Sequence, residues 1–214
     1  NSRVSGFTLL QLLSVMAILC VASALVITLW PRARMSANRS NSGAGLKQLV
    51  THESVWRTQD TDGNGAADNW TRDVAAFHCL HDRAGKAVAY IDRAFARSDK
   101  APAVAYPELG GVVSSKQGYF HQAMLTDSNG RPYVDPSLSP PRAGNAPSGS
   151  CTNARGFGFI GFPGTYNSDG VLIFMVNEDG VVWQKDAGAA APPPLDRRQA
   201  APERPVSGWT QFGG

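Results

Sequence analysis

Residues 6–19 read GFTLLQLLSVMAIL and open the longest apolar stretch of the chain. From Phe7 to Trp30 the sequence runs for 24 residues without a charged side chain. A helix rises ~1.5 Å per residue, so this segment is long enough to cross a hydrocarbon layer of ~30 Å. A short, mostly polar lead, residues 1–6, precedes it. The pattern predicts a leader over residues 1–6 and a transmembrane helix over residues 7–30.

The junction between the lead and the apolar run resembles the processing site of type IV prepilins and type II secretion pseudopilins. Gly6, Phe7 and the Thr-Leu-Leu that follows carry the resemblance. In that family a prepilin peptidase cuts after the glycine and methylates the new N-terminal aromatic residue, here Phe7. The resemblance implies a single-pass protein of the bacterial inner membrane, with its globular domain in the periplasm or on an extracellular filament. The implied partners are other pilin or pseudopilin subunits, the prepilin peptidase and the inner-membrane assembly platform.

One position departs from the family pattern. Members usually carry glutamate at the fifth mature position, where this chain has Gln11. In the resembling proteins that carboxylate is thought to neutralise the free amine of the neighbouring subunit, since an unpaired charge in lipid is costly. Gln11 can form hydrogen bonds but cannot neutralise a charge, which favours a minor subunit of a pilus or pseudopilus. The alternative is a membrane-anchored envelope binding module that keeps the prepilin signal but does not polymerise.

Two simpler interpretations of the apolar segment stay open. It is also compatible with a plain anchor, or with a secretory signal peptide cleaved after Ala24, where Ala22-Ser23-Ala24 has the small-residue pattern. Signal-peptide cleavage would leave the apolar residues 25–30 at the new N-terminus. The flanking charges do not settle the orientation, because Arg3 precedes the segment and several arginines follow it.

Beyond the anchor, the sequence predicts one globular domain over residues 31–188 and a Pro/Ala-rich, disordered tail over 189–214. The fold class expected is α+β and pilin-like, in which a long N-terminal helix that emerges from the membrane packs on an antiparallel β-meander. We expect Pro31 to kink this helix, the polar residues 32–45 to form a hinge or weak helix, and the helix to resume over 45–57.

Shorter elements are expected after this helix. Apolar spacing predicts extra short helices over residues 71–82 and 86–97. Four apolar runs separated by turn residues predict the strands of the meander, over residues 118–125, 157–162, 171–176 and 181–185. The segments at residues 162–166 and 176–186 also resemble uncharacterised bacterial pilin-like exported proteins, a likeness that brings no activity with it.

An acidic loop follows the first helix. Its side-chain oxygens fall at loop positions 1, 3, 5 and 9, with a glycine at position 6, as in an EF-hand calcium loop. The twelfth position, which should supply a bidentate carboxylate, is Thr71, so the sequence predicts a weak Ca²⁺ site at best. The alternative is a turn that caps the next helix. The residues assigned to the site are Asp60, Asp62, Asn64, Ala66 and Asp68.

Two cysteines lie in the part of the chain that is expected to be exported, Cys79 and Cys151. An oxidising compartment would allow them to form one disulfide; two unpaired cysteines are the alternative.

The remaining motifs argue against catalysis. The sequence has no nucleophile elbow, phosphate-binding loop or dinucleotide fingerprint, so we expect no enzymatic activity. The formal net charge of +3 comes from scattered basic residues, which gives no sign of nucleic-acid binding. No cofactor is required, and Ca²⁺ is the one ion the pattern favours.

Overall fold

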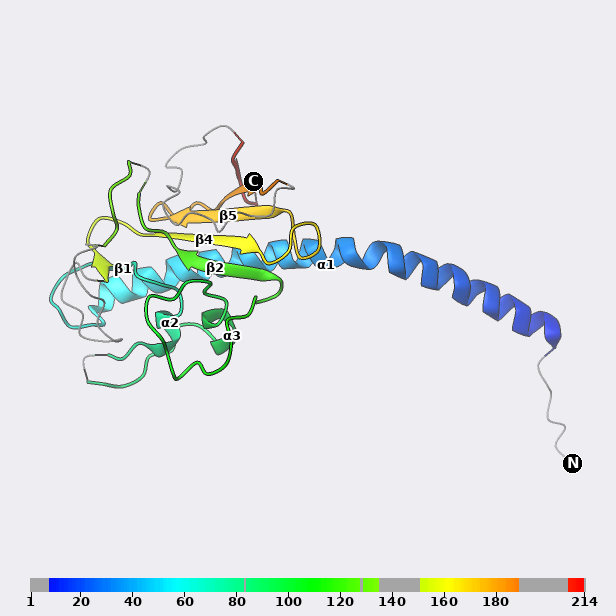
Figure 1. The fold of residues 1–214 in the computed structure, drawn as a ribbon, viewed down its shortest axis with the longest axis horizontal. Coiled ribbons are helices and arrows are strands. Elements are labelled where there is room, and N and C mark those ends of the chain that lie inside the picture. The colour runs from blue at the N-terminus through cyan, green and yellow to red at the C-terminus, as the bar shows by residue number, and fades with distance from the viewer. Residues whose placement is uncertain (1–7, 83, 128, 135–150, 189–207, 214) are drawn as a thin grey trace, which may run out of the picture.

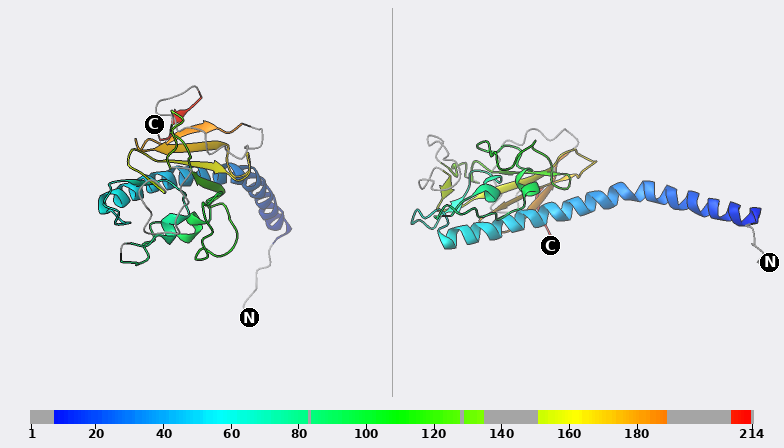
Figure 2. Two further views of the ribbon diagram at one scale, coloured as in Figure 1. Left: turned by 60° about the vertical axis from the view of Figure 1, so that its left-hand side comes forward. Right: turned by 90° about the horizontal axis from the view of Figure 1, so that it is seen from below.

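The chain has an α+β fold in which one very long helix packs on an antiparallel sheet (Figure 1). The computed structural model describes residues 8–82, 84–127, 129–134, 151–188 and 208–213. Helix α1 (Leu9–Gln59) spans 51 residues. Its C-terminal half lies along the sheet, and its N-terminal half projects away from the globular part (Figure 2).

The main sheet has five strands in the order β2-β4-β5-β6-β7, and every neighbouring pair is antiparallel. The expected four-strand antiparallel meander is confirmed, with β7 added at one edge. A second, two-stranded sheet joins β1 to β3. The strands are β1 (Asn69–Trp70), β2 (Tyr119–Ala123), β3 (Thr152–Asn153), β4 (Gly158–Pro163), β5 (Leu172–Asn177), β6 (Trp183–Asp186) and β7 (Thr210–Gln211).

Of the two alternatives expected for residues 32–45, the structure shows the helix and no hinge, because α1 continues through Pro31 as one curved helix (Figure 2). Its two glycines in this region lie where aromatic rings approach the helix closely. A Cβ on Gly43 would lie 2.3 Å from the ring of Phe212, and a Cβ on Gly45 would lie 3.1 Å from the ring of Phe95. The glycines therefore serve packing here and do not interrupt the helix.

The face of α1 that covers the sheet is a stripe at spacings of three and four residues, as one side of a helix requires. Its N-terminal part is polar and its C-terminal part mostly apolar, and all of its members are buried. They are Asn38, Ser42, Leu46, Leu49, Glu53 and Trp56.

Both predicted short helices exist, but each starts later and ends earlier than predicted. Helix α2 (Ala76–Cys79) begins after Asp73, whose Oδ1 accepts from the backbone N–H of Ala76 at 3.1 Å. Helix α3 (Arg93–Ala96) begins after Asp92, whose Oδ1 accepts from the N–H of Phe95 at 2.8 Å. Such side-chain acceptors satisfy the free N–H groups of a first turn and fix where it starts.

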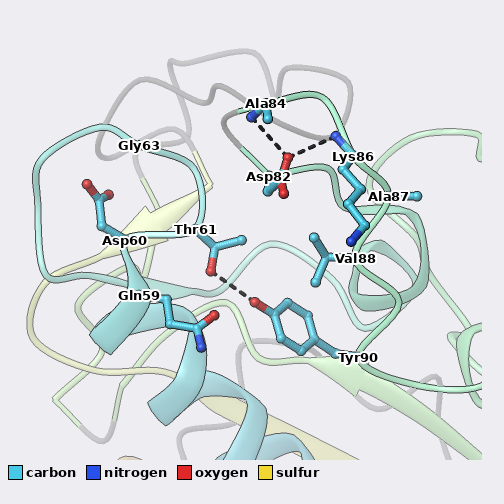
Figure 3. A pocket seen from close by; sticks show the side chains of 10 residues that line it. All are labelled: Gln59, Asp60, Thr61, Gly63, Asp82, Ala84, Lys86, Ala87, Val88 and Tyr90. Carbon is cyan, nitrogen blue, oxygen red and sulfur yellow. Dashed lines mark hydrogen bonds between the residues drawn. The ribbon is translucent and has the colours of Figure 1, made fainter.

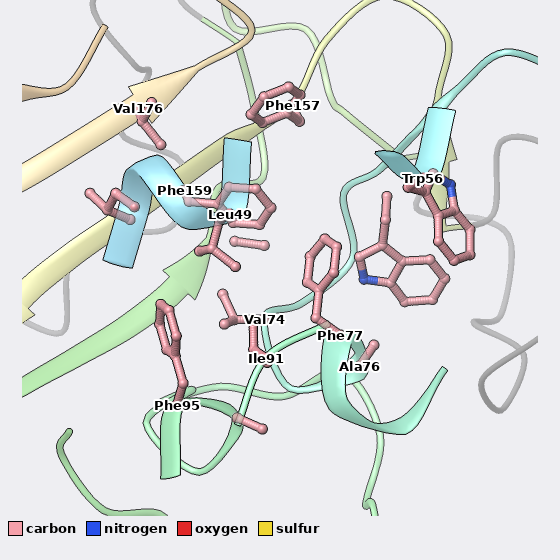
Figure 4. Close-up of a cluster of buried hydrophobic side chains, with 14 of the residues drawn as sticks. Leu49, Trp56, Val74, Ala76, Phe77, Ile91, Phe95, Phe157, Phe159 and Val176 are labelled. Atoms are coloured by element: carbon pink, nitrogen blue, oxygen red, sulfur yellow. The ribbon is translucent and has the colours of Figure 1, made fainter. Parts of the chain in front are cut away.

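The main hydrophobic core lies between α1, the sheet and the two short helices (Figure 4). Aromatic rings fill its centre in edge-on pairs. The ring centroids of Phe77 and Phe159 are 6.0 Å apart, and those of Trp56 and Trp70 are 5.6 Å apart. The core thus joins residues far apart in the sequence, from the end of α1 to strand β4.

The prediction of a disordered tail is wrong for its last residues. Thr210 and Gln211 form β7 and pair with β6, and Phe212 packs against Phe174 with centroids 5.4 Å apart. The sheet edge supplies backbone partners and α1 supplies a glycine notch for the ring. Residues 189–207 lie outside the described residues.

Candidate functional site

Two features of the structure bear on function. One is the apolar N-terminal half of α1, and the other is the acidic loop, residues 60–68, which follows the C-terminal end of α1. An 18-residue window of this helix has a mean hydropathy of 2.7, and none of it is buried within the protein. Leu9, Ile18 and Trp30 are 84%, 68% and 68% exposed. Helix α1 is therefore long and apolar enough to span a membrane.

The start of α1 is closed by a reciprocal pair of hydrogen bonds. The backbone N–H of Gln11 donates to Thr8 Oγ1 at 3.3 Å, and the N–H of Thr8 donates to Gln11 Oε1 at 2.9 Å. This capping box satisfies two N–H groups that a helix start otherwise leaves without partners. The side chain assigned to assembly from the sequence thus caps its own helix. Gly6 and Phe7, the expected processing site, lie outside the described residues.

The acidic loop begins where α1 ends. Asp60 caps the helix in a left-handed conformation, with φ of 43°, and its N–H donates to the carbonyl of Trp56. A cleft of about 560 Å³ opens beside it, lined by the loop and by the segment that precedes α3 (Figure 3). Thr61 and Tyr90 join the two walls through a hydrogen bond of 2.9 Å between their hydroxyls.

Hydrogen bonds inside the loop hold its polar side chains together. The Asn64 amide Nδ2 donates to Asp62 Oδ2 at 2.9 Å and to Asp68 Oδ2 at 3.2 Å. Asn64 Oδ1 accepts from the N–H of Ala66 at 2.7 Å, and Asp60 Oδ2 accepts from the N–H of Gly65 at 3.0 Å. The structure thus brings the sequence-assigned residues into one loop.

One acidic residue beside the loop is not found by the loop motif. Glu53 is fully buried on the inner stripe of α1, and its Oε2 accepts from the N–H of Trp70 at 2.9 Å. Burial raises the pKa of Glu53 well above its usual range, and the charge of Asp68 raises it further. The signal that could have found it is a glutamate at a position where the helical stripe requires burial.

The carboxylates of the loop also interact with one another. Burial, followed by the charge of Asp68, raises the pKa of Asp62 to about 6. Within the described part of the chain, no three His, Cys, Asp or Glu side chains are arranged to hold a metal ion as they stand. Cation binding at this loop would therefore require the side chains to turn inward.

A second polar cluster joins three elements behind the sheet. His121 on β2 is buried, with Nδ1 2.8 Å from Ser98 Oγ and Nε2 3.4 Å from Ser42 Oγ. Ser98 Oγ lies 2.7 Å from the carbonyl of Phe95 and donates to it, which leaves the histidine N–H to donate to Ser98. Burial lowers the pKa of His121 to about 3, so the ring is a poor base. The cluster ties α1 to β2 and α3.

The predicted disulfide is not formed: Cys79 and Cys151 are both present as thiols. Cys79 ends α2, whereas the carbonyl of Cys151 accepts from the N–H of Thr71 at 2.8 Å, beside the small β1–β3 sheet. The two cysteines are thus held by different elements. Burial raises the pKa of the Cys79 thiol to about 12.

Thiol titration tests whether Cys79 and Cys151 are thiols. In denaturant without reductant, a Cys20→Ser variant is expected to show two reactive thiols. In the native state Cys79 should react slowly, because the thiolate is the nucleophile and its formation is suppressed. If no thiol reacts in denaturant and two react after reduction, the two cysteines form a disulfide.

Comparison with known proteins gives one partial match. Residues 150–211 match the model of a family described as protein of unknown function, DUF2950. The match spans β3 to β7, less than a third of the chain, and leaves out α1 and the acidic loop. No curated protein and no solved structure matches the chain.

Proposed function

We propose that this protein is a minor structural subunit of a type IV pilus or a type II secretion pseudopilus. In this proposal the apolar half of α1 anchors the chain in the bacterial inner membrane and bundles with the same helix of other subunits. The observation that carries it is the long helix with two different halves. Residues 9–30 expose apolar side chains along their length, whereas the stripe from Asn38 to Trp56 is buried on the sheet.

The arrangement suits assembly better than catalysis. A helix that is apolar around its exposed surface needs lipid or other helices to cover it. The globular domain would then decorate the surface of a filament, or face the periplasm while the subunit stays in the membrane. The buried histidine is a poor base, and its two serine neighbours are also buried, which gives no support to a hydrolytic site.

The second candidate function is an envelope binding module that is anchored in the same way but never polymerises. Gln11 favours it, because its side chain caps its own helix and carries no charge with which to neutralise the free amine of a neighbouring subunit. A glutamate at this position would cap equally well and would add the negative charge that Gln11 lacks.

Filament fractionation separates the two functions. The protein is expressed with its secretion or pilus machinery, filaments are sheared, and the chain is sought in them and in the inner membrane. We expect the wild type in filaments at a low level, and a Gln11→Glu variant to be incorporated several-fold more. Exclusive recovery of both proteins from the inner membrane would favour the non-polymerising module.

The same membrane preparation tests processing. Intact mass is expected to show a chain that starts at an N-methylated Phe7, and a Gly6→Leu variant should keep its leader. A mature chain starting at Leu25 would instead identify a removed signal peptide and contradict the proposal.

A further inference from the structure

Glu53 presents a buried oxygen that lacks a hydrogen-bond partner. The side chain is fully buried, Oε2 is held by the N–H of Trp70, and Oε1 has no partner in the part of the chain that the structure describes. A buried acceptor left unsatisfied is costly, and a buried carboxylate without a positive partner more so. This oxygen is therefore a candidate ligand for a cation.

The position of Glu53 places this oxygen at the acidic loop. Trp70, whose backbone N–H donates to Glu53 Oε2, follows Asp68 by only two residues. Glu53 thus faces the end of the loop from the helix side. A second buried oxygen, Asp60 Oδ1, also has no hydrogen-bond partner among the described residues.

Negative charge accumulates here from two sources. Three aspartates and Glu53 lie close together at the C-terminal end of α1, where the helix itself carries a partial negative charge. The amide nitrogen of Asn64 stands between the carboxylates of Asp62 and Asp68 and donates to both. A positive partner is therefore favoured between these two side chains.

We propose that the loop from Asp60 to Asp68 and Glu53 together bind one Ca²⁺, with Glu53 supplying the carboxylate that the twelfth loop position lacks. An EF-hand loop takes its bidentate ligand from the helix that follows it. Here Thr71 stands at that position, and the carboxylate would come instead from the helix that precedes the loop. The cation would tie the end of α1 to strand β1, and this assignment is independent of the proposed assembly function.

Two tryptophans offer a direct probe. Trp56 lies one turn after Glu53 on α1, and Trp70 binds Glu53 through its backbone. Tb³⁺, which replaces Ca²⁺ at oxygen sites, should show tryptophan-sensitised luminescence in the full chain held in detergent micelles. Added Ca²⁺ should displace it. Thermal melts of the same sample should show a midpoint about 5 °C or more higher in 10 mM CaCl₂ than in chelator.

Glu53→Gln is the decisive variant, because glutamine can still accept from Trp70 while it removes the charge. We expect this variant to lose the Ca²⁺ shift and to bind Tb³⁺ at least tenfold more weakly. Asp179→Asn, which removes an exposed carboxylate in the β5–β6 turn, is the matched control and should keep both responses. If Glu53→Gln does not fold, Glu53→Asp, which keeps the charge on a shorter side chain, should show the same weakening. A wild-type shift retained in a folded Glu53 variant, or no shift in the wild type, would overturn the proposal.

Discussion

Arginines in place of both Ile18 and Leu19 are expected to release the chain from the membrane fraction. The two residues lie at the middle of the uncharged segment and are 68% and 54% exposed. An arginine at the centre of a membrane helix costs about 2.5–3.5 kcal/mol on the insertion scale, so the pair costs about 5–7 kcal/mol. Since 1.4 kcal/mol is a factor of ten, insertion should fall by more than a thousandfold.

Val112→Arg with Val113→Arg provides the matched control for this experiment. These valines are also exposed and apolar, but they lie in the loop between α3 and β2. The control should remain in the membrane fraction after carbonate extraction and should dissolve only in detergent. If the Ile18/Leu19 variant behaves in the same way as the control, the apolar half of α1 is not what holds the chain in the membrane.

The strands could be predicted from the sequence because their signal is local. Strand β5 is apolar on both faces and is covered on both faces in the structure, so its composition alone indicates its place. Turn residues such as Gly180, with φ of 71°, mark where the chain reverses. The two small strands β1 and β3 were missed, because each has only two residues and depends on the other.

The continuity of α1 could not be predicted, because the residues that hold it are polar or small. Asn38 donates to the carbonyl of Asp169 at 2.9 Å, and Arg34 forms an ion pair with the same residue at 2.9 Å. Gly43 and Gly45 are poor helix formers until aromatic rings from distant segments occupy the space beside them. These partners lie about 50 to 170 positions further along the chain, so no local pattern reports them.

The acidic loop shows the same division between local and distant information. The spacing from Asp60 to Asp68 is a local motif, and the structure does gather these residues into one loop. Glu53 joins the proposed site only because Trp70 folds back on α1 and donates its backbone N–H to the Glu53 carboxylate. A loop motif read forward along the chain looks for the twelfth ligand at Thr71 and misses a carboxylate on the preceding helix.

Replacing Phe159 by alanine is expected to produce a large loss of stability in the globular part. Its side chain is fully buried on β4, with ring centroids 6.0 Å from Phe77 and 5.6 Å from Phe157. Truncation of a buried phenylalanine costs about 3–5 kcal/mol, because the cavity it leaves closes only in part. For a chain of this size, the midpoint of thermal unfolding should fall by roughly 10 °C.

Phe120→Ala is the matched control, since this ring is half-buried on the neighbouring strand β2 and packs in the smaller cluster. The midpoint of thermal unfolding of Phe120→Ala should fall by less than half as much, measured by near-ultraviolet circular dichroism in the same detergent.

The comparison of the two variants also addresses the segment that matches the family of unknown function. Phe159 lies inside residues 150–211, but its partner Phe77 lies outside. If both variants lose the same stability, the contact across that boundary does not hold the sheet to the rest of the domain. If only Phe159→Ala is severe, the main cluster that Phe159 shares with Phe77 stabilises the domain more than the smaller cluster does.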